Sequence, residues 1–215
     1  RTAGGHRKLL VADVLRLARE GDFPRLDLSR LGFVAEGGGL ADTASLSRQL
    51  SAALKRGDRD AVRSLTQGAY RSGVAMETLA DFVIAPAMNE LGHEWEAGRI
   101  DVLHEHRATQ LCASALYDLK AGVEVGADPD RPLAVGGSPE QDDYALPNLL
   151  AELVLLDLGW RVTALGPGTP MRSFRLALTE LRPRLLWLSV SRLADQERFL
   201  AEYRELYQEA EPAGV

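Results

Sequence analysis

The sequence predicts a mixed fold, in which a four-helix bundle is followed by a parallel α/β domain. From residue 41 to about 122, apolar residues recur at helical spacing. After the loop at 126–129 the pattern changes, and short apolar runs alternate three times with helical stretches. Such strand–helix units indicate a parallel sheet with right-handed crossovers. The length of 215 residues allows one large domain or two small ones.

The bundle is assigned to residues 41–124. Its first helix is marked by Leu46, Leu50 and Leu54, which recur every four residues. Further helices are expected from about 62, from about 74 to 95, and after Asp101, which is a credible N-cap. Pro86 falls inside the third helix and predicts a kink or a restart there. Four helices with short connections are typical of an antiparallel bundle.

The α/β domain is assigned to residues 131–215 and is expected to be Rossmann-like. Its strands are expected at 133–135, 160–165 and 185–191, and its helices at 146–158, 171–181 and 195–210. Three strands are few for such a domain, so we expect it to be truncated at its C-terminal end. Ligands of open α/β sheets bind outside the carboxyl ends of the strands. Here those ends are the loops 136–147, 166–170 and 189–195.

Composition excludes several classes of protein. Hydrophobic residues make up 46% and charged residues 26% of the chain, which is typical of a globular protein and not of a disordered one. No apolar run approaches the length of a membrane helix, and no signal peptide is recognisable. The single cysteine, Cys112, fits a reducing cytoplasm. With a net charge of −6, any contact with nucleic acid requires a local basic patch.

Asp142 and Asp143, in the first of these sheet-edge loops, have two interpretations. In the first, they are turn and N-cap residues for the helix that follows, a common role of short acidic side chains. Alternatively, they face a ligand at the sheet edge. The loops contain no GxGxxG pattern, P-loop lysine or basic cluster, so neither a dinucleotide nor a bare phosphate is expected.

The segment 132–191 resembles the cobalamin-binding domain of methionine synthase and its relatives. That family's Asp-x-His-x-x-Gly, Leu-Gly and Ser-x-Thr motifs align without a gap with 142–147, 165–166 and 189–191. Tyr144 stands where the family has its cobalt-binding His, and Pro147 stands where it has Gly. The residues that the resemblance implies at the cofactor are Asp142, Tyr144, Gly166, Ser189 and Ser191.

Trp95, Glu105 and His106 form the candidate set in the bundle. Trp95 ends one helix, and the other two lie one turn into the next, so all three can converge on one surface. Glu105 also begins a helix stripe that is otherwise small and apolar, where an unpaired charge is costly. The alternative is that Trp95 belongs to the core and the two polar residues make surface contacts.

The spacing from Trp95 to Glu105-His106 resembles the light-sensing bundle of CarH-type regulators. The resemblance implies that adenosylcobalamin lies between bundle and α/β domain, with the Trp against the adenosyl group and the Glu and His over the same upper face. In that family a His follows the Trp and captures cobalt after photolysis, whereas this chain has Glu96. Both cobalt-ligand histidines are therefore replaced, by Tyr144 below and by Glu96 above, and no metal ligand is assigned.

Other cofactors remain open at this point. Cys112 could attach a bilin or ligate haem, although a small buried hydrophobic residue is its more ordinary role. His104 and His106 are two residues apart on a helix, so they face different ways and cannot share a metal. Without Cys-x-x-Cys or His-x-x-x-His pairs, a zinc site is not expected.

The N-terminal residues 1–36 resemble the end of a winged helix-turn-helix domain of MerR and excisionase type, followed by a linker. The motif Arg-Thr-x-Gly-Gly-His-Arg carries the resemblance, and its basic residues suit contacts to phosphate oxygens. The recognition helix would precede the first residue. The candidate DNA-binding residues are Arg1, Thr2, Gly4, Gly5, His6, Arg7 and Lys8.

These parts together predict a cytoplasmic transcription regulator that responds to light or to a ligand. The effector is cobalamin or a related tetrapyrrole, the partner is DNA, and the chain is expected to form a homo-oligomer away from membranes. No nucleophile–base pair is recognisable, so an enzyme is not expected. The alternatives are a degenerate cobalamin domain that accepts bilin or haem, a scaffold without a cofactor, and a corrinoid methyl-carrier protein.

Overall fold

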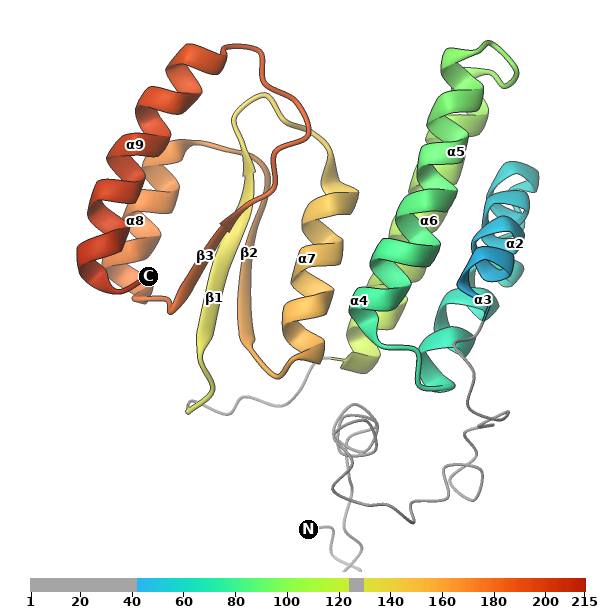
Figure 1. The fold of residues 1–215 in the computed structure, drawn as a ribbon, viewed down its shortest axis with the longest axis horizontal. Helices are drawn as coiled ribbons and strands as arrows, with labels where there is room; N and C mark the ends of the chain where they lie inside the picture. The colour runs from blue at the N-terminus through green and yellow to red at the C-terminus, as the bar shows by residue number, and fades with distance from the viewer. Residues whose placement is uncertain (1–41, 124–129) are drawn as a thin grey trace, which may run out of the picture. The chain divides into compact units, whose positions relative to one another are not determined.

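The structure is a computed structural model, and it describes residues 42–123 and 130–215. Packing divides the chain into two compact units, with the boundary between Val125 and Gly126 (Figure 1). The first unit is helical and the second combines helices with a small sheet. The expected wing at residues 1–8 and the rest of the expected N-terminal remnant lie outside the described residues.

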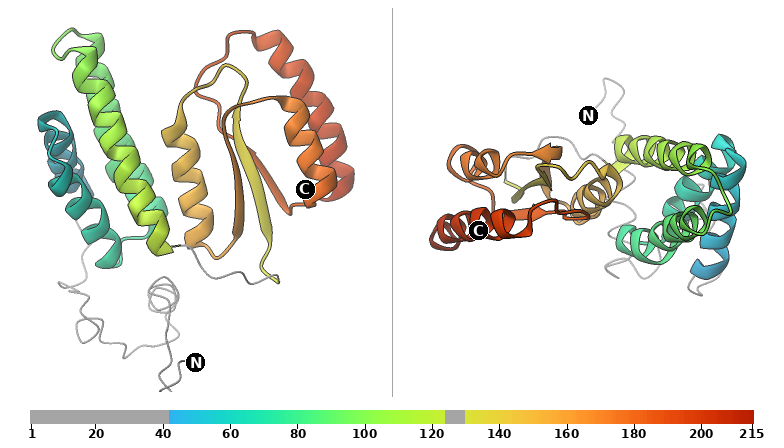
Figure 2. Two further views of the ribbon diagram at one scale, coloured as in Figure 1. Left: turned by 180° about the vertical axis from the view of Figure 1, so that it is seen from behind. Right: turned by 90° about the horizontal axis from the view of Figure 1, so that it is seen from above.

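The helical unit is the four-helix bundle that the periodicity predicts. Its third helix is one continuous rod built from two α-helical pieces and a π-helical turn (Figures 1 and 2). The elements are α2 (Thr43–Arg56), α3 (Arg59–Arg71), α4 (Met76–Leu79), η2 (Ala80–Ile84), α5 (Ala85–Glu96) and α6 (Val102–Val123).

Short acidic side chains begin three of these helices. The Asp42 carboxylate accepts a hydrogen bond from the backbone N–H of Ser45, and Asp58 accepts one from Ala61, both at 3.0 Å. Asp101 accepts from Leu103 N–H at 2.8 Å, which confirms its expected role as a cap. These carboxylates satisfy N–H groups that have no partner inside the first turn.

The π-helical turn η2 lies immediately before Pro86. The N–H of Ala85 donates to the carbonyl of Ala80, five residues back, which is the π-helical pattern. Pro86 has no N–H to offer the carbonyl of Phe82, and its ring would collide with that carbonyl in a regular helix. The wider turn removes this conflict without breaking the helix. The disruption expected at Pro86 is therefore a π-helical turn before it.

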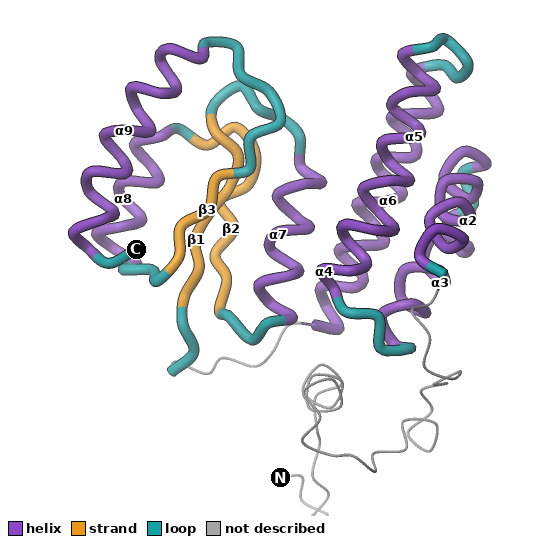
Figure 3. Tube along the Cα trace, viewed as in Figure 1, coloured by secondary structure: helices purple, strands orange, loops and turns teal. Residues whose placement is uncertain are grey.

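The second unit contains a three-stranded parallel sheet in the order β2-β1-β3 (Figure 3). Its elements are β1 (Leu133–Pro139), α7 (Ala145–Asp157), β2 (Arg161–Thr169), α8 (Met171–Leu181), β3 (Leu185–Leu188) and α9 (Gln196–Ala213). Side chains of β3 alternate between the two faces. Leu186 and Leu188 join a core with α8 and α9, whereas the Trp187 indole donates to Asn148 of α7 at 3.0 Å.

Two strand ends differ from the sequence prediction. The first strand was expected to end before Gly136, but β1 continues through it, because Gly136 pairs with Ala164 of β2 and Trp187 of β3. A Cβ at Gly136 would lie 2.1 Å from the ring of Trp187. This glycine is required by close packing in the ladder. The third strand was expected to reach Ser191 but ends at Leu188. Beyond it, the backbone amides of Ser191 and Arg192 donate to a buried carboxylate instead of to a strand.

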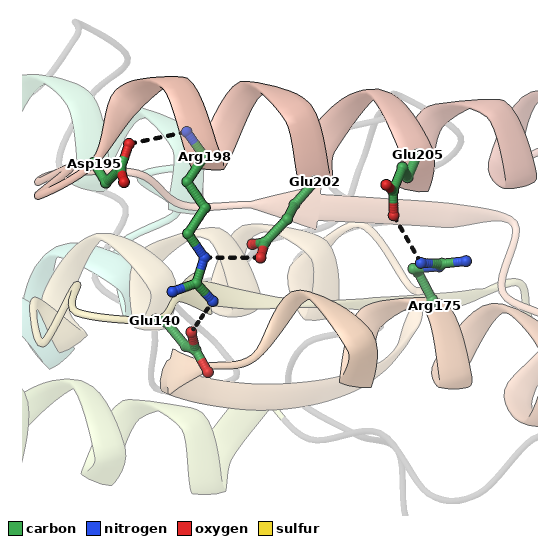
Figure 4. Close-up of polar contacts among 6 residues, drawn as sticks. All are labelled: Glu140, Arg175, Asp195, Arg198, Glu202 and Glu205. Carbon is green, nitrogen blue, oxygen red and sulfur yellow. Dashed lines mark hydrogen bonds and ion pairs between the residues drawn. The ribbon is translucent and has the colours of Figure 1, made fainter.

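Ion pairs attach α9 to its neighbours (Figure 4). The Arg198 guanidinium donates to Glu202 on its own helix at 2.9 Å and to Glu140, just after β1, at 3.0 Å. Arg175 of α8 donates to Glu205 of α9 at 2.9 Å and also pairs with Glu209. Glu140 links the start of α9 to the carboxyl edge of the sheet. In the described ranges, no helix combines the length and apolarity needed to cross a bilayer.

Candidate functional site

The bundle residues Trp95, Glu105 and His106 lie at one end of the helical unit. Trp95 is one residue before the end of α5, and a short turn leads to α6, which carries the other two in its first turns. The Trp95 side chain is 47% exposed, so it is not a core residue. The alternative in which Trp95 belongs to the core is therefore wrong.

Glu105 is a partly buried carboxylate whose two oxygens have different partners. The Thr109 hydroxyl donates to Oε1 at 2.9 Å, and Nδ1 of His106 lies 2.9 Å from Oε2. These contacts explain how a charge is tolerated on a stripe that is otherwise apolar, since a satisfied carboxylate avoids most of the desolvation penalty. The spacing pointed to Glu105 but not to the role of Thr109, which follows only from the i, i+4 contact.

His106 has a defined tautomer in its neutral form. Its Nδ1 faces two acceptors, Oε2 of Glu105 and the carbonyl oxygen of Val102 at 3.1 Å, so Nδ1 carries the ring proton. The other nitrogen, Nε2, then holds a lone pair. In the described residues it has no hydrogen-bond partner, and the side chain is 74% exposed.

Three nearby residues do not join this group. Glu96, at the end of α5, is exposed. The Nδ1 atom of His104 is buried, which agrees with its expected position on a different face from His106. Cys112 is completely buried, and burial raises the pKa of its thiol to about 12. A neutral, inaccessible thiol argues against covalent bilin attachment and against haem ligation by sulfur.

The sheet-edge residues are organised around Asp142, which is fully buried. Its Oδ1 accepts from the backbone N–H of Tyr144 at 3.1 Å, and its Oδ2 accepts from Ser191 at 2.5 Å and Arg192 at 3.2 Å. Its carbonyl accepts from Gly168 N–H at 3.1 Å. One residue therefore connects the loop after β1, the C-terminal end of β2 and the loop after β3.

This arrangement confirms the turn role of Asp142, whose Oδ1 accepts from the N–H two residues on, and corrects the N-cap role expected of the two aspartates. The residue at the N-cap of α7 is Tyr144, with no side-chain capping bond, and Asp142 reaches across to the loop after β3. Ser191 is thus brought to Asp142 through its backbone. Ser189 is half-buried, its N–H donating to Gly137, and Gly166 turns the chain with a φ of +83°.

Tyr144 is 58% exposed, and its hydrogen bonds in the described chain are made by its backbone. A phenol is not an imidazole, and the Asp142 carboxylate already accepts from three amides. This edge therefore does not supply the histidine ligand that the cobalamin resemblance implies. At the bundle end, by contrast, the free Nε2 of His106 has the donor chemistry of a metal ligand.

No group of three or more His, Cys, Asp or Glu side chains within 42–123 and 130–215 is arranged to hold a bare metal ion.

Comparisons with known proteins give a family match for the helical unit. Residues 46–120 match a family model described as a B12 binding domain. The matched range lies within the helical unit and includes Trp95, Glu105 and His106. The match confirms that the helical unit resembles a cobalamin-binding bundle.

The chain is also similar to two HTH-type transcriptional repressors of Myxococcus xanthus. It is 33% identical to CarH over 119 residues, which are 55% of this chain and 39% of that protein. It is 29% identical to CarA over 143 residues, which are 65% of this chain and 46% of that protein. The expected resemblance to CarH-type regulators is thereby confirmed, and the chain spans less than half the length of these relatives.

Among solved structures, the fold resembles that of the Methanosarcina barkeri monomethylamine corrinoid protein. The TM-score is 0.58 at 16% identity, and the likeness covers 78% of each chain. It confirms the expected fold class, a helical bundle with a Rossmann-like unit.

Proposed function

We propose that this chain is the sensory part of a cytoplasmic, corrinoid-responsive transcription regulator and not an enzyme. Its effector is cobalamin, adenosylcobalamin included, which contacts the bundle end and the carboxyl edge of the sheet. The observation that carries the proposal is the B12 binding domain match over 46–120, which contains an exposed indole beside an ordered Glu–His pair. The similarity to two transcriptional repressors supports a regulatory role.

In this proposal the two units have distinct tasks. The exposed face of Trp95 supplies flat apolar surface for the effector, and Glu105 with His106 supplies polar contacts. At the sheet edge, Asp142 fixes the loops that carry Tyr144, Gly166, Ser189 and Ser191, so that they present a constant surface. A bound corrinoid would supply the cobalt ion, with these residues of the two units around it.

Effector binding then changes the assembly of the regulator. Homo-oligomers bind repeated half-sites, so a change of oligomeric state alters DNA affinity through effective concentration. The wing residues Arg1, Thr2, Gly4, Gly5, His6, Arg7 and Lys8 are proposed to contact DNA phosphates when the DNA-binding domain is intact.

A scaffold without a cofactor is the second candidate. It is favoured by Glu96 and Tyr144 at the two positions where histidine ligands are implied, and by the use of the Asp142 carboxylate for loop amides. A corrinoid methyl carrier is less well supported, because the solved carrier shares only the fold.

The test is retention of cobalamin by the purified chain. The protein is incubated with adenosylcobalamin, or separately with biliverdin or haem, desalted, and its ultraviolet–visible spectrum is recorded in the dark and after illumination. Retained corrin absorbance supports the proposal, and a change on illumination assigns a light sensor. Retained bilin or haem without corrin overturns the choice of cofactor, and retention of none supports the scaffold.

A variant pair locates the site. Trp95→Ala is expected to reduce corrin retention about tenfold or more, because it removes the exposed indole. The matched control is Leu158→Ala, which truncates a similarly exposed apolar side chain in the other unit, 58% exposed. Equal retention by both variants would place the corrinoid elsewhere.

A further inference from the structure

The Glu105–His106 pair has the arrangement of a metal ligand with its supporting partner. Ligating histidines almost always donate their second ring N–H to a carboxylate, a carbonyl or water, which fixes the tautomer and raises the basicity of the free nitrogen. His106 donates Nδ1–H toward both a carboxylate and a carbonyl. Thr109 in turn holds that carboxylate. The ring is therefore oriented with Nε2 directed away from its own partners.

The other described histidines lack this arrangement. Nδ1 of His104 is buried without a hydrogen-bond partner. His93, in the last turn of α5, is exposed, and its ring makes no hydrogen bond or ion pair in the described chain. His106 is thus the imidazole in the described chain that is both accessible and oriented by a carboxylate.

A single imidazole cannot hold a free metal ion. In the described ranges there is no cluster of three metal-ligating side chains that could complete a coordination sphere. The metal must therefore arrive with most of its ligands already attached, as it does in a tetrapyrrole macrocycle with one open axial position. The cobalamin match of this unit selects cobalt in a corrin.

We infer that Nε2 of His106 is a direct ligand to the cobalt ion of a corrinoid whose upper axial position holds only water. This inference rests on the proposed function. The exchange is a ligand substitution with no change of oxidation state. The Nε2 lone pair forms the Co–N bond, the Co–O bond breaks, and water leaves. Nδ1 stays protonated, and its N–H remains hydrogen-bonded to the Glu105 carboxylate.

Two cobalamins separate ligation from mere contact. In aquacobalamin the upper axial position is exchangeable, whereas in adenosylcobalamin a carbon ligand fills it. His106→Ala is expected to weaken aquacobalamin binding roughly 10- to 100-fold, as loss of a ligand or its partner does in other metal sites, and to weaken adenosylcobalamin binding less than about threefold. His93→Ala, which removes an exposed imidazole from the neighbouring helix, is the matched control and leaves both unchanged.

Spectra identify the ligating atom. Aquacobalamin bound to the wild-type chain is expected to show the absorption bands of an imidazole-ligated corrin, and His106→Ala to restore the bands of the aquo form. Low-spin Co(III) is diamagnetic, so with ¹⁵N-histidine the Nε2 resonance is expected to move by tens of ppm on binding while Nδ1–H persists.

The outcomes are distinguishable. If the wild-type chain retains no cobalamin, the proposed function and this inference both fail. If cobalamin is retained with an aquo spectrum, or if His106→Ala weakens both cobalamins equally, the proposed function stands and the ligand assignment is wrong. Glu105→Gln provides a further readout, because loss of the carboxylate is expected to raise the fraction of the Nε2–H tautomer and to weaken aquacobalamin binding several-fold.

Discussion

The bundle end and the sheet edge use their polar residues in opposite ways. At the bundle end, the Glu105 carboxylate is satisfied locally and leaves one nitrogen of His106 open to solvent. At the sheet edge, the Asp142 carboxylate is buried and accepts from backbone amides of two loops, while the exposed Tyr144 side chain makes no hydrogen bond in the described chain. One region leaves a donor atom open to solvent, and the other uses its carboxylate to hold its own loops in place.

The largest effect on stability is expected from Asp142→Ala. Three backbone N–H groups would lose a charged acceptor in a buried position, and the free energy of unfolding of the α/β unit should fall by about 3 kcal/mol. Chemical denaturation followed by the fluorescence of Trp187, in a background where Trp95 and Trp160 are replaced by Phe, measures this. Asp143→Ala changes the exposed neighbour and should have almost no effect. Similar losses from both variants would contradict the role of the Asp142 clamp, by which we mean the Asp142 carboxylate and the three amides that donate to it.

At the bundle end, removal of the His106 side chain should barely affect the free energy of unfolding. His106→Ala removes a side chain that is 74% exposed, so unfolding of the helical unit should change by less than about 0.5 kcal/mol. Thermal unfolding followed by circular dichroism measures it. A loss as large as that of Asp142→Ala would mean that His106 is structural, and the contrast between the two regions would disappear.

Cys112 tests whether the bundle interior is closed to solvent. Because burial raises the pKa of its thiol to about 12, alkylation by iodoacetamide at pH 8 should be roughly 1,000-fold slower in the native chain than in urea. The same shift lowers stability above about pH 9, where the thiol of the unfolded chain ionises and the buried thiol does not. Cys112→Ala should remove that part of the alkaline dependence. Rapid alkylation of the native protein would show that the thiol is accessible, and Cys112 would again be a candidate for covalent attachment of a bilin.

The smallest effect is expected from the exposed ion pairs of α9. Arg198→Gln removes the contacts to Glu140 and Glu202, and a slight fall in melting temperature at low salt should vanish in 1 M NaCl because salt screens exposed charges. Arg204→Gln, on the same helix but with no ion pair in the described chain, is the control. A loss that persists in high salt would show that Arg198 also contributes packing.

The fold could be predicted from the sequence because helix and strand periodicities are local. The expected bounds of α8 are those observed, and the cap at Asp101 is confirmed. The errors arose where distant residues decide local structure. Gly136 continues a strand because Trp187 packs against it from β3, which a local pattern does not reveal.

The candidate site was predictable only as a set of residues. The spacing singled out Glu105 and His106, and the structure shows that they contact each other. The sequence did not reveal that the Asp142 carboxylate accepts from the amide of Ser191, 49 residues later in the chain. A carboxylate that binds a ligand and one that binds loop amides look alike in a sequence, since both are short acidic residues after a strand.

The Asp142 clamp also bears on how this edge can evolve. Every hydrogen bond that Asp142 accepts comes from the main chain, at Tyr144, Gly168, Ser191 and Arg192. Selection can therefore exchange the side chains at 144, 191 and 192 without altering the loop path, because each non-proline residue offers the same amide. A tyrosine in place of histidine is an exchange of this kind. The side chains of this edge can therefore change while the scaffold beneath them stays the same.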